Sequence, residues 1–304
     1  LYILMVKIKI KQVDAFTTTP HSGNPAGVVD GKDLTEQQMQ AIARELNLSE
    51  TAFVLPPTKP DADVRLRWFS PTTEVPLCGH ATVATFHSLA EEGKLDMTTQ
   101  GKYYFKVDTA SGILPVEVTK NGSVNSVMFG LKVSTLERVT HYKIDLVRVL
   151  NIPFGDFESQ IAMVRTDYLY VPLKRLHTLF SLKPDFLTMA KFLQTRKLRG
   201  MCLFTTETID RESVVHSRFF APNIGINEDP VTGSAHGPLA VFLYELGILD
   251  IKNGRCIFQG EQGDAIGRRG RVSVELCVDD GKPVSVKIGG NAVTVLEGEM
   301  VLRE

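Results

Sequence analysis

One pattern occurs twice in this chain, and it limits the possible folds more than any other feature. The first copy is RWFSPTTEVPLCGHATVATFHSLAEEGKL from Arg67, and the second is RFFAPNIGINEDPVTGSAHGPLAVFLYELGIL from Arg218. The matching positions pair Phe69 with Phe220, Pro71 with Pro222, Pro76 with Pro230, Cys78 with Thr232, Gly79 with Gly233, His80 with Ser234, Gly93 with Gly247 and Leu95 with Leu249. Each copy reads as a strand, a loop and an apolar helix, so the spacing predicts two similar lobes.

Short runs of alternating apolar and polar residues, separated by Gly, Pro and Asn, fill much of the chain. Such runs are typical of antiparallel sheet. The sequence therefore predicts an α+β fold of two pseudo-repeated lobes, each a mostly antiparallel sheet wrapped around a central helix that begins at Gly79 or Gly233. We expect the first lobe at residues 5–125 and the second at 126–289. Whether residues 290–304 return to the first lobe is left open.

Local signals predict a few further elements. Residues 35–38 form a capping box, which predicts a helix from this point with Asn47 as its stop. Another helix is expected over 185–193. Near the C-terminus, two separate strands are expected at 283–288 and 292–296, with glycines and an asparagine between them.

The charge balance and hydropathy exclude several classes of partner. The formal net charge is -1, whereas nucleic-acid and membrane surfaces are usually bound by a concentrated basic face. No run approaches the roughly 18 apolar residues that a membrane-spanning helix needs. The first residues, LYILMVKIKIKQVDAF, lack the basic start and the cleavage site of a secretion signal. We therefore expect a cytoplasmic protein that binds neither nucleic acid nor membrane.

The cysteines do not suggest a disulfide framework. They are Cys78, Cys202, Cys256 and Cys277, and no two of them form a C-x-x-C pair. Without such a pair, neither a disulfide framework nor a zinc cluster is indicated. The expectation is four reduced thiols and no bound metal.

Both duplicated helices begin at a glycine, and this suggests a kind of ligand. A helix N-terminus presents unpaired backbone N–H groups and the positive end of the helix dipole. If the two halves face each other, the starts at Gly79 and Gly233 meet at one cleft. Two such ends favour a small carboxylate as the ligand.

Four stretches of the chain, two of them within the repeated pattern, resemble a known family. They are DAFTTTPHSGNPAGVV from Asp14, LSETAFVLP from Leu48, RWFSPTTEVPLCGHAT from Arg67 and EDPVTGSAHG from Glu228. Together they resemble the phenazine-biosynthesis isomerase (PhzF-like) family, which shares the fold of diaminopimelate epimerase. The resemblance implies a homodimer and a cofactor-independent isomerase, in which a glutamate moves a proton on a small carboxylated metabolite.

The resemblance also implies roles for single residues. Glu50 matches the catalytic glutamate, and His80 matches a histidine that orients the substrate or donates a proton. Asp229 and Ser234 match a polar pair at the second helix start, where they would contact the substrate. From the residues alone, Glu50 can equally be a solvated cap, His80 a core histidine and Ser234 a helix cap.

Cys78 occupies the position at which the related epimerases carry one of two catalytic thiols. The matching position in the second lobe is Thr232, and a hydroxyl is far less acidic than a thiol. A racemase that uses two bases needs an acid and a base on opposite faces of one carbon, so the two-cysteine mechanism is excluded. Cys78 is then expected to be a small buried residue that lines the substrate site. Asn24 either reaches the cleft or belongs to an Asn-Pro turn.

The favoured prediction is an isomerase with Glu50, His80 and Asp229 in catalysis. Gly79, Gly233, Ser234, Asn24 and Cys78 are the expected substrate-binding residues. Two alternatives are kept. One is a racemase or epimerase that uses Cys78 alone, and the other is a protein of the same fold that binds a metabolite without reaction.

Overall fold

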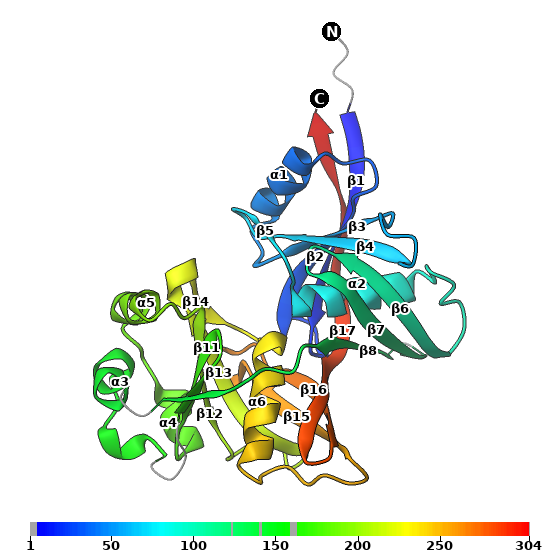
Figure 1. The fold of residues 1–304 in the computed structure, drawn as a ribbon. Coiled ribbons are helices and arrows are strands. Elements are labelled where there is room, and N and C mark those ends of the chain that lie inside the picture. The colour runs from blue at the N-terminus through cyan, green and yellow to red at the C-terminus, as the bar shows by residue number, and fades with distance from the viewer. Residues whose placement is uncertain (1–4, 123, 140–141, 159–162, 304) are drawn as a thin grey trace. The chain divides into compact units, whose positions relative to one another are not determined.

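The computed structural model describes residues 5–122, 124–139, 142–158 and 163–303 of the chain. The chain divides into two compact units. The first unit comprises Leu1–Gly130 together with Gly289–Glu304, and the second comprises Leu131–Ile288. Strands outnumber helices in both units (Figure 1). The expectation of a mixed, sheet-dominated fold with few helices is confirmed.

In its described residues, the first unit contains two helices and the strands from β1 to β8. Its elements are β1 (Met5–Ala15), β2 (Asn24–Asp30), α1 (Glu36–Leu46), β3 (Thr51–Leu55), β4 (Val64–Phe69), β5 (Glu74–Val75), α2 (Gly79–Glu91), β6 (Gly101–Thr109), β7 (Gly112–Asn121), β8 (Val124–Leu131) and the C-terminal part of β17 (Lys282–Arg303). Strand β1 pairs antiparallel with both β2 and β17, and β2 pairs parallel with β3. Antiparallel pairs then join β3 to β4, β6 to β7 and β7 to β8.

Helix α2 forms much of the core of the first unit. Every residue from His80 to Ala90 is buried, and the helix contacts β1, β2, β3 and β7. A helix that is buried on every side needs neighbours all round, which the surrounding strands supply. Helix α1 covers a different cluster, in which Met39 and Ile42 pack with Phe53 and Phe69.

The second unit carries the remaining helices. Its elements are β9 (Glu137–Val139), α3 (Lys143–Leu150), η1 (Phe154–Asp156), β10 (Met163–Arg165), β11 (Tyr168–Pro172), α4 (Leu176–Ser181), α5 (Phe186–Thr195), β12 (Gly200–Thr205), β13 (Ser213–Ala221), η2 (Pro222–Ile224), β14 (Ile226–Asp229), α6 (Gly233–Glu245), β15 (Arg255–Gln262), η3 (Asp264–Ile266), β16 (Gly270–Asp279) and the start of β17. Strand β13 pairs antiparallel with β12 and β14 and parallel with β15. Helix α6 is buried from Ala235 to Leu243 and contacts β16.

Several local predictions are confirmed by the structure. Thr35 and Gln38 form the capping box of α1, and Asn47 ends this helix in the left-handed conformation. The expected helix over 185–193 is α5, which Asp185 caps. The two expected C-terminal strands are wrong as separate elements, because β17 runs through 282–303 without a break. No described helix has the length and hydrophobicity to cross a membrane.

Close packing in the second unit gives a first testable prediction. The buried ring of His236 lies so close to Gly260 that an added Cβ would be 2.5 Å from His236 Cδ2. Gly260→Ala is therefore expected to lower the free energy of unfolding by about 1–3 kcal/mol, because a closely packed core tolerates extra atoms poorly. Urea unfolding measures this. Gly155→Ala is the control, since nothing lies within 4 Å of its added Cβ, and equal stability of both variants would contradict the prediction.

Candidate active site

In the first unit, three of the predicted site residues lie together at the start of α2. Nε2 of His80 lies 3.4 Å from Oε2 of Glu50, and Nδ1 of His80 lies 3.5 Å from Sγ of Cys78. The imidazole thus has the carboxylate beside one nitrogen and the thiol beside the other. The structure thus brings together Glu50, His80 and Cys78, which the sequence named separately as candidate site residues.

Regular structure holds this group in place. Cys78 is the N-cap of α2, and its carbonyl accepts hydrogen bonds from the backbone N–H and the hydroxyl of Thr82. Glu50 directly precedes β3, and its carbonyl accepts a hydrogen bond of 3.1 Å from Gly27 in β2. A helix start therefore fixes Cys78, and a strand start fixes Glu50.

Burial determines the charge of His80. The side chain is 7% exposed, and desolvation lowers its pKa to about 4. At neutral pH the ring is uncharged, so its contact with Glu50 is not an ion pair. A carboxylate only accepts, so this contact favours the tautomer with the proton on Nε2. Nδ1 then accepts from the thiol of Cys78, which opposes the use of Cys78 as a free base.

The same three residues carry atoms that can act as metal ligands. One donor atom each of Glu50, Cys78 and His80 lie within 4.8 Å of one another. Carboxylate, thiolate and imidazole are all zinc ligands. However, His80 turns different nitrogens to its two neighbours, whereas a histidine ligand binds an ion through one nitrogen. This arrangement, with Glu50 beside one ring nitrogen and Cys78 beside the other, does not fit three ligands around one ion.

In the second unit, the predicted polar pair lies around the start of α6. Asp229 ends β14, and its Oδ2 accepts a hydrogen bond of 2.5 Å from the hydroxyl of Thr232, the N-cap of α6. Ser234 is the second residue of α6, and its side chain makes no N-cap bond because that position belongs to Thr232. The interpretation of Ser234 as the helix cap is therefore wrong.

Tyr168 is a polar neighbour of Ser234 that the sequence did not indicate. Its hydroxyl lies 3.3 Å from the hydroxyl of Ser234, and its ring packs edge-on against Phe219. Burial raises the pKa of the Tyr168 hydroxyl, which therefore stays protonated at neutral pH. No motif marks the segment around β11, so only the fold brings this residue to α6.

The remaining predicted residues have clear structural places. Gly79 begins α2, where an added Cβ would lie 2.9 Å from the ring of Phe129, so packing alone requires a glycine here. Gly233 is buried as the first residue of α6. Asn24 is fully buried and begins β2, so of the two alternatives for this residue the Asn-Pro turn is wrong.

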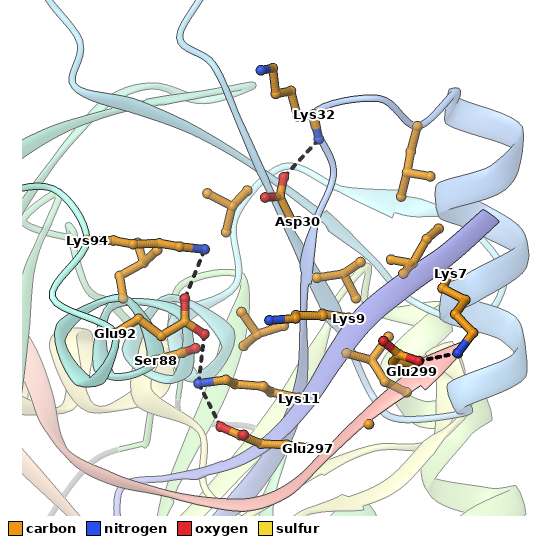
Figure 2. Close-up of a pocket in the computed structure, with 18 of the residues that line it drawn as sticks. Lys7, Lys9, Lys11, Asp30, Lys32, Ser88, Glu92, Lys94, Glu297 and Glu299 are labelled. Atoms are coloured by element: carbon orange, nitrogen blue, oxygen red, sulfur yellow. Dashed lines mark hydrogen bonds and ion pairs between the residues drawn. The ribbon is translucent and has the colours of Figure 1, made fainter. Parts of the chain in front are cut away.

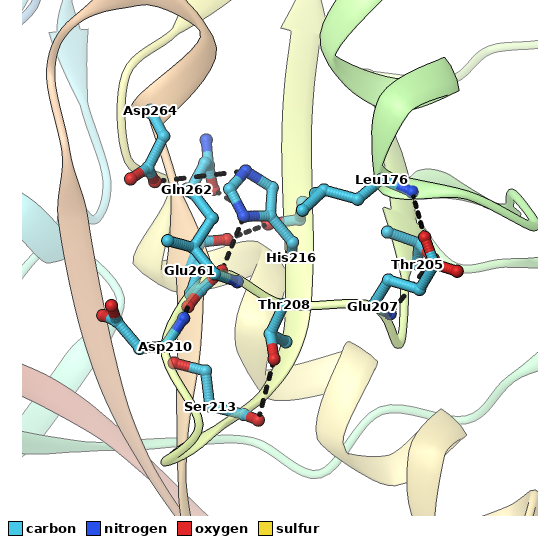
Figure 3. Close-up of polar contacts among 12 residues, drawn as sticks. Leu176, Thr205, Glu207, Thr208, Asp210, Ser213, His216, Glu261, Gln262 and Asp264 are labelled. Atoms are coloured by element: carbon cyan, nitrogen blue, oxygen red, sulfur yellow. Dashed lines mark hydrogen bonds and ion pairs between the residues drawn. The ribbon is translucent and has the colours of Figure 1, made fainter.

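A buried polar cluster supports the strand that follows α6 (Figure 3). Nδ1 of His216 lies 2.7 Å from Oε2 of Glu261, and both side chains are fully buried. The carboxylate of Glu261 also accepts hydrogen bonds from the backbone of Ile209 and Asp210. The cluster therefore fixes β15 against β13 one residue before Gln262, which contacts the start of α6.

A pocket of about 710 Å³ in the first unit lies away from these residues (Figure 2). None of the predicted site residues lines it. Its lysines are largely paired with acids: Lys7 with Glu299, Lys11 with Glu92 and Glu297, and Lys94 with Glu92. Because these charges compensate one another, the pocket does not have the character of an anion site.

Known proteins resemble this chain over almost its whole length. The model of the phenazine biosynthesis-like proteins (PhzC-PhzF) matches residues 13–298. An uncharacterized isomerase of Clostridium acetobutylicum is 41% identical over 303 residues, which cover 97% of this chain and 99% of that protein. An uncharacterized isomerase of Escherichia coli K12 is 34% identical over 308 residues, with 98% and 99% covered.

Solved structures agree with these relatives. The crystal structure of a PhzF-family phenazine biosynthesis protein of Bacillus anthracis has a TM-score of 0.87 at 30% identity, covering 98% of this chain and 100% of that one. A hydroxyproline epimerase of Agrobacterium vitis shares the fold, with a TM-score of 0.62 at 12% identity over 98% and 92% of the two chains. Fold, site and relatives define the class: this chain is an isomerase. It belongs to the phenazine biosynthesis-like family.

Proposed function

We propose that this isomerase moves a proton on a small carboxylated metabolite without a cofactor, and that Glu50 is its acid and base. The observation that carries the proposal is the contact of 3.4 Å between Oε2 of the largely buried Glu50 and Nε2 of the buried His80. Nε2 is buried and has no hydrogen-bond partner among the described residues. A substrate oxygen or carbon placed beside this nitrogen would therefore also lie beside the carboxylate.

The neutral state of His80 suits a reaction of this kind. When a base removes a proton next to a carboxylate or an unsaturated system, negative charge develops on the substrate. A neutral N–H group that is held in place stabilises this charge by donating a hydrogen bond, and it keeps its own proton. Glu50 would take the proton and return it to another carbon, while His80 holds the charged intermediate.

The duplicated helix starts would bind the remainder of the substrate. Backbone N–H groups at Gly79 and Gly233, with the Ser234 hydroxyl, are suited to a carboxylate. Asp229 accepts hydrogen bonds, so it would bind a hydroxyl or an amine. We further propose that the two units are the two copies of one lobe, each built around its glycine-started helix. Residues 5–125 together with the C-terminal strand 290–304 would approximate the first copy, and residues 126–289 the second. The homodimer and the use of one substrate by both helix starts stay predictions.

Proton exchange with solvent tests the proposed reaction. Carboxylated metabolites are first screened for an increase in the unfolding temperature of the protein. Those that bind are then incubated with it in D2O and followed by NMR. Deuterium entering a substrate carbon, or a proton moving between two carbons, supports the proposal. Tight binding of several such metabolites without any exchange would reject it.

A racemase that uses Cys78 alone is the second candidate, since Cys78 Sγ lies 3.5 Å from His80 Nδ1. The contact with His80 predicts instead that the thiol is a donor to the ring. Cys78→Ser keeps a donor at this position, so the deuterium exchange rate is expected to fall by less than about 10-fold. Complete loss of exchange in Cys78→Ser, with exchange kept in Glu50→Gln, would favour the racemase. Membership in an isomerase family argues against the third alternative, a protein that only binds.

A further inference from the structure

The N-cap of α6 does not cap its helix. A threonine at this position usually accepts a hydrogen bond from a backbone N–H in the first turn. Thr232 makes no such bond. Its hydroxyl instead contacts Asp229 Oδ2 at 2.5 Å and Gln262 Nε2 at 3.1 Å. The Thr232 hydroxyl could stabilise the helix, but it binds the carboxylate of Asp229 instead. The proposed function places this carboxylate in the site.

Gln262 fixes the direction of these hydrogen bonds. Its Oε1 lies 3.1 Å from the backbone N of Thr232, and its Nε2 lies 2.9 Å from the backbone O of Asp229. A backbone N–H only donates and a carbonyl only accepts, so the orientation of this amide is determined. Nε2 therefore donates to the hydroxyl of Thr232, and the proton of that hydroxyl must point to Asp229.

The chain of donors is buried and supported from behind. Gln262 is 1% exposed and Thr232 8% exposed. The hydroxyl of Ser217 lies 3.2 Å from the carbonyl of Glu261 and 3.4 Å from Gln262 Oε1, and these two acceptors share its single proton. Through Glu261, this support continues into the cluster around His216 (Figure 3). Gln262 is therefore held rigidly, and so is the carboxylate of Asp229, which accepts the last of these hydrogen bonds.

We propose that Thr232 and Gln262 are positioning residues for Asp229, which they hold as an oriented hydrogen-bond acceptor at the start of α6. This inference rests on the proposed function. It also gives a role to the position that matches Cys78 in the other copy of the repeat. Each N-cap side chain leaves its own helix uncapped and contacts a polar group of the site: Cys78 contacts His80, and Thr232 contacts Asp229.

Two substitutions of Thr232 separate positioning from simple support of the turn. Thr232→Val keeps the branched shape and removes the hydroxyl, whereas Thr232→Ser keeps the hydroxyl. The readout is kcat/KM for deuterium exchange into a substrate found in the screen. We expect a loss of about 10- to 100-fold in Thr232→Val, as for one hydrogen bond to a charged group, and a loss of less than about 3-fold in Thr232→Ser.

A double-mutant cycle with Asp229→Asn provides the decisive comparison. If Thr232 acts through Asp229, Thr232→Val has no further effect in the Asp229→Asn background. A full additional loss in that background, or wild-type activity of Thr232→Val alone, would overturn the inference. Thermal unfolding confirms that each variant is folded. Unchanged activity of Asp229→Asn itself would instead remove Asp229 from the proposed function, so the two failures are distinguishable.

Discussion

Glu50→Gln is expected to lower the rate of proton exchange by about 10³-fold or more. General acid–base groups contribute factors of about 10² to 10⁴, and an amide has no proton affinity at neutral pH with which to replace the carboxylate. The side-chain oxygen of glutamine can still occupy the place of Glu50 Oε2, 3.4 Å from His80 Nε2, so the geometry of the site is retained. The measurement is deuterium incorporation from D2O, followed by NMR under single-turnover and multiple-turnover conditions.

Ligand binding separates this result from a loss of folding. The substituted protein is expected to keep its unfolding temperature and the increase in that temperature with ligand, because the amide is isosteric with the acid. Glu45→Gln is the matched control, since Glu45 is an exposed carboxylate on α1 in the same unit. An exchange rate within a few fold of wild type in Glu50→Gln would remove this residue from the mechanism.

Local signals in the sequence were sufficient where the structure itself is local. The capping box of α1 joins Thr35 to Gln38 within one turn, so its residues stand together in the sequence. The start of α4 shows the opposite case. The backbone N–H of Leu176 donates a hydrogen bond to the carboxylate of Glu207, which lies in a distant segment of the sequence (Figure 3). No pattern near Leu176 indicates such a cap, and the sequence did not predict this helix.

The glycines of β17 misled the prediction for a physical reason. A glycine between two apolar runs usually indicates a turn. At Gly289, an added Cβ would lie 1.8 Å from the carbonyl oxygen of Val127 in β8. Here the glycine permits two backbones to approach closely within a continuous strand, which is its other known use. Sequence alone does not distinguish these two uses.

The same distinction applies to the site. Cys78 and His80 are neighbours in the sequence, so their association could be predicted from it. The chain from Gln262 through Thr232 to Asp229 joins positions 30 residues apart, and Tyr168 reaches Ser234 across 66 positions. These contacts exist only because strands and helix starts bring distant segments together. The sequence therefore indicated candidate residues for the site, while their charge states and supports required the structure.

The second large effect is a loss of stability in mild acid. Burial lowers the pKa of both His80 and His236 from 6.5 to about 4. Between these values the unfolded chain binds a proton at each histidine that the folded chain does not bind. The free energy of unfolding therefore falls as the pH falls from 6.5 to 4, by about 3 kcal/mol for each histidine. Together they approach the whole stability of an ordinary domain.

Urea unfolding at several pH values between 7 and 4 measures this loss. His236→Asn tests its origin, because the amide of asparagine can still donate to the carbonyl of Thr232, as Nδ1 of His236 does. This substitution is expected to remove about half of the pH dependence, whereas His177→Asn, at an exposed position of α4, should leave it unchanged. Asp108 does not interfere, since its pKa is lowered to about 2 and its contribution is lost only below pH 3.8. A flat stability curve down to pH 4 would show that the folded protein accommodates charged histidines. The proposed reaction assumes that His80 is neutral, and this assumption would then be wrong as well.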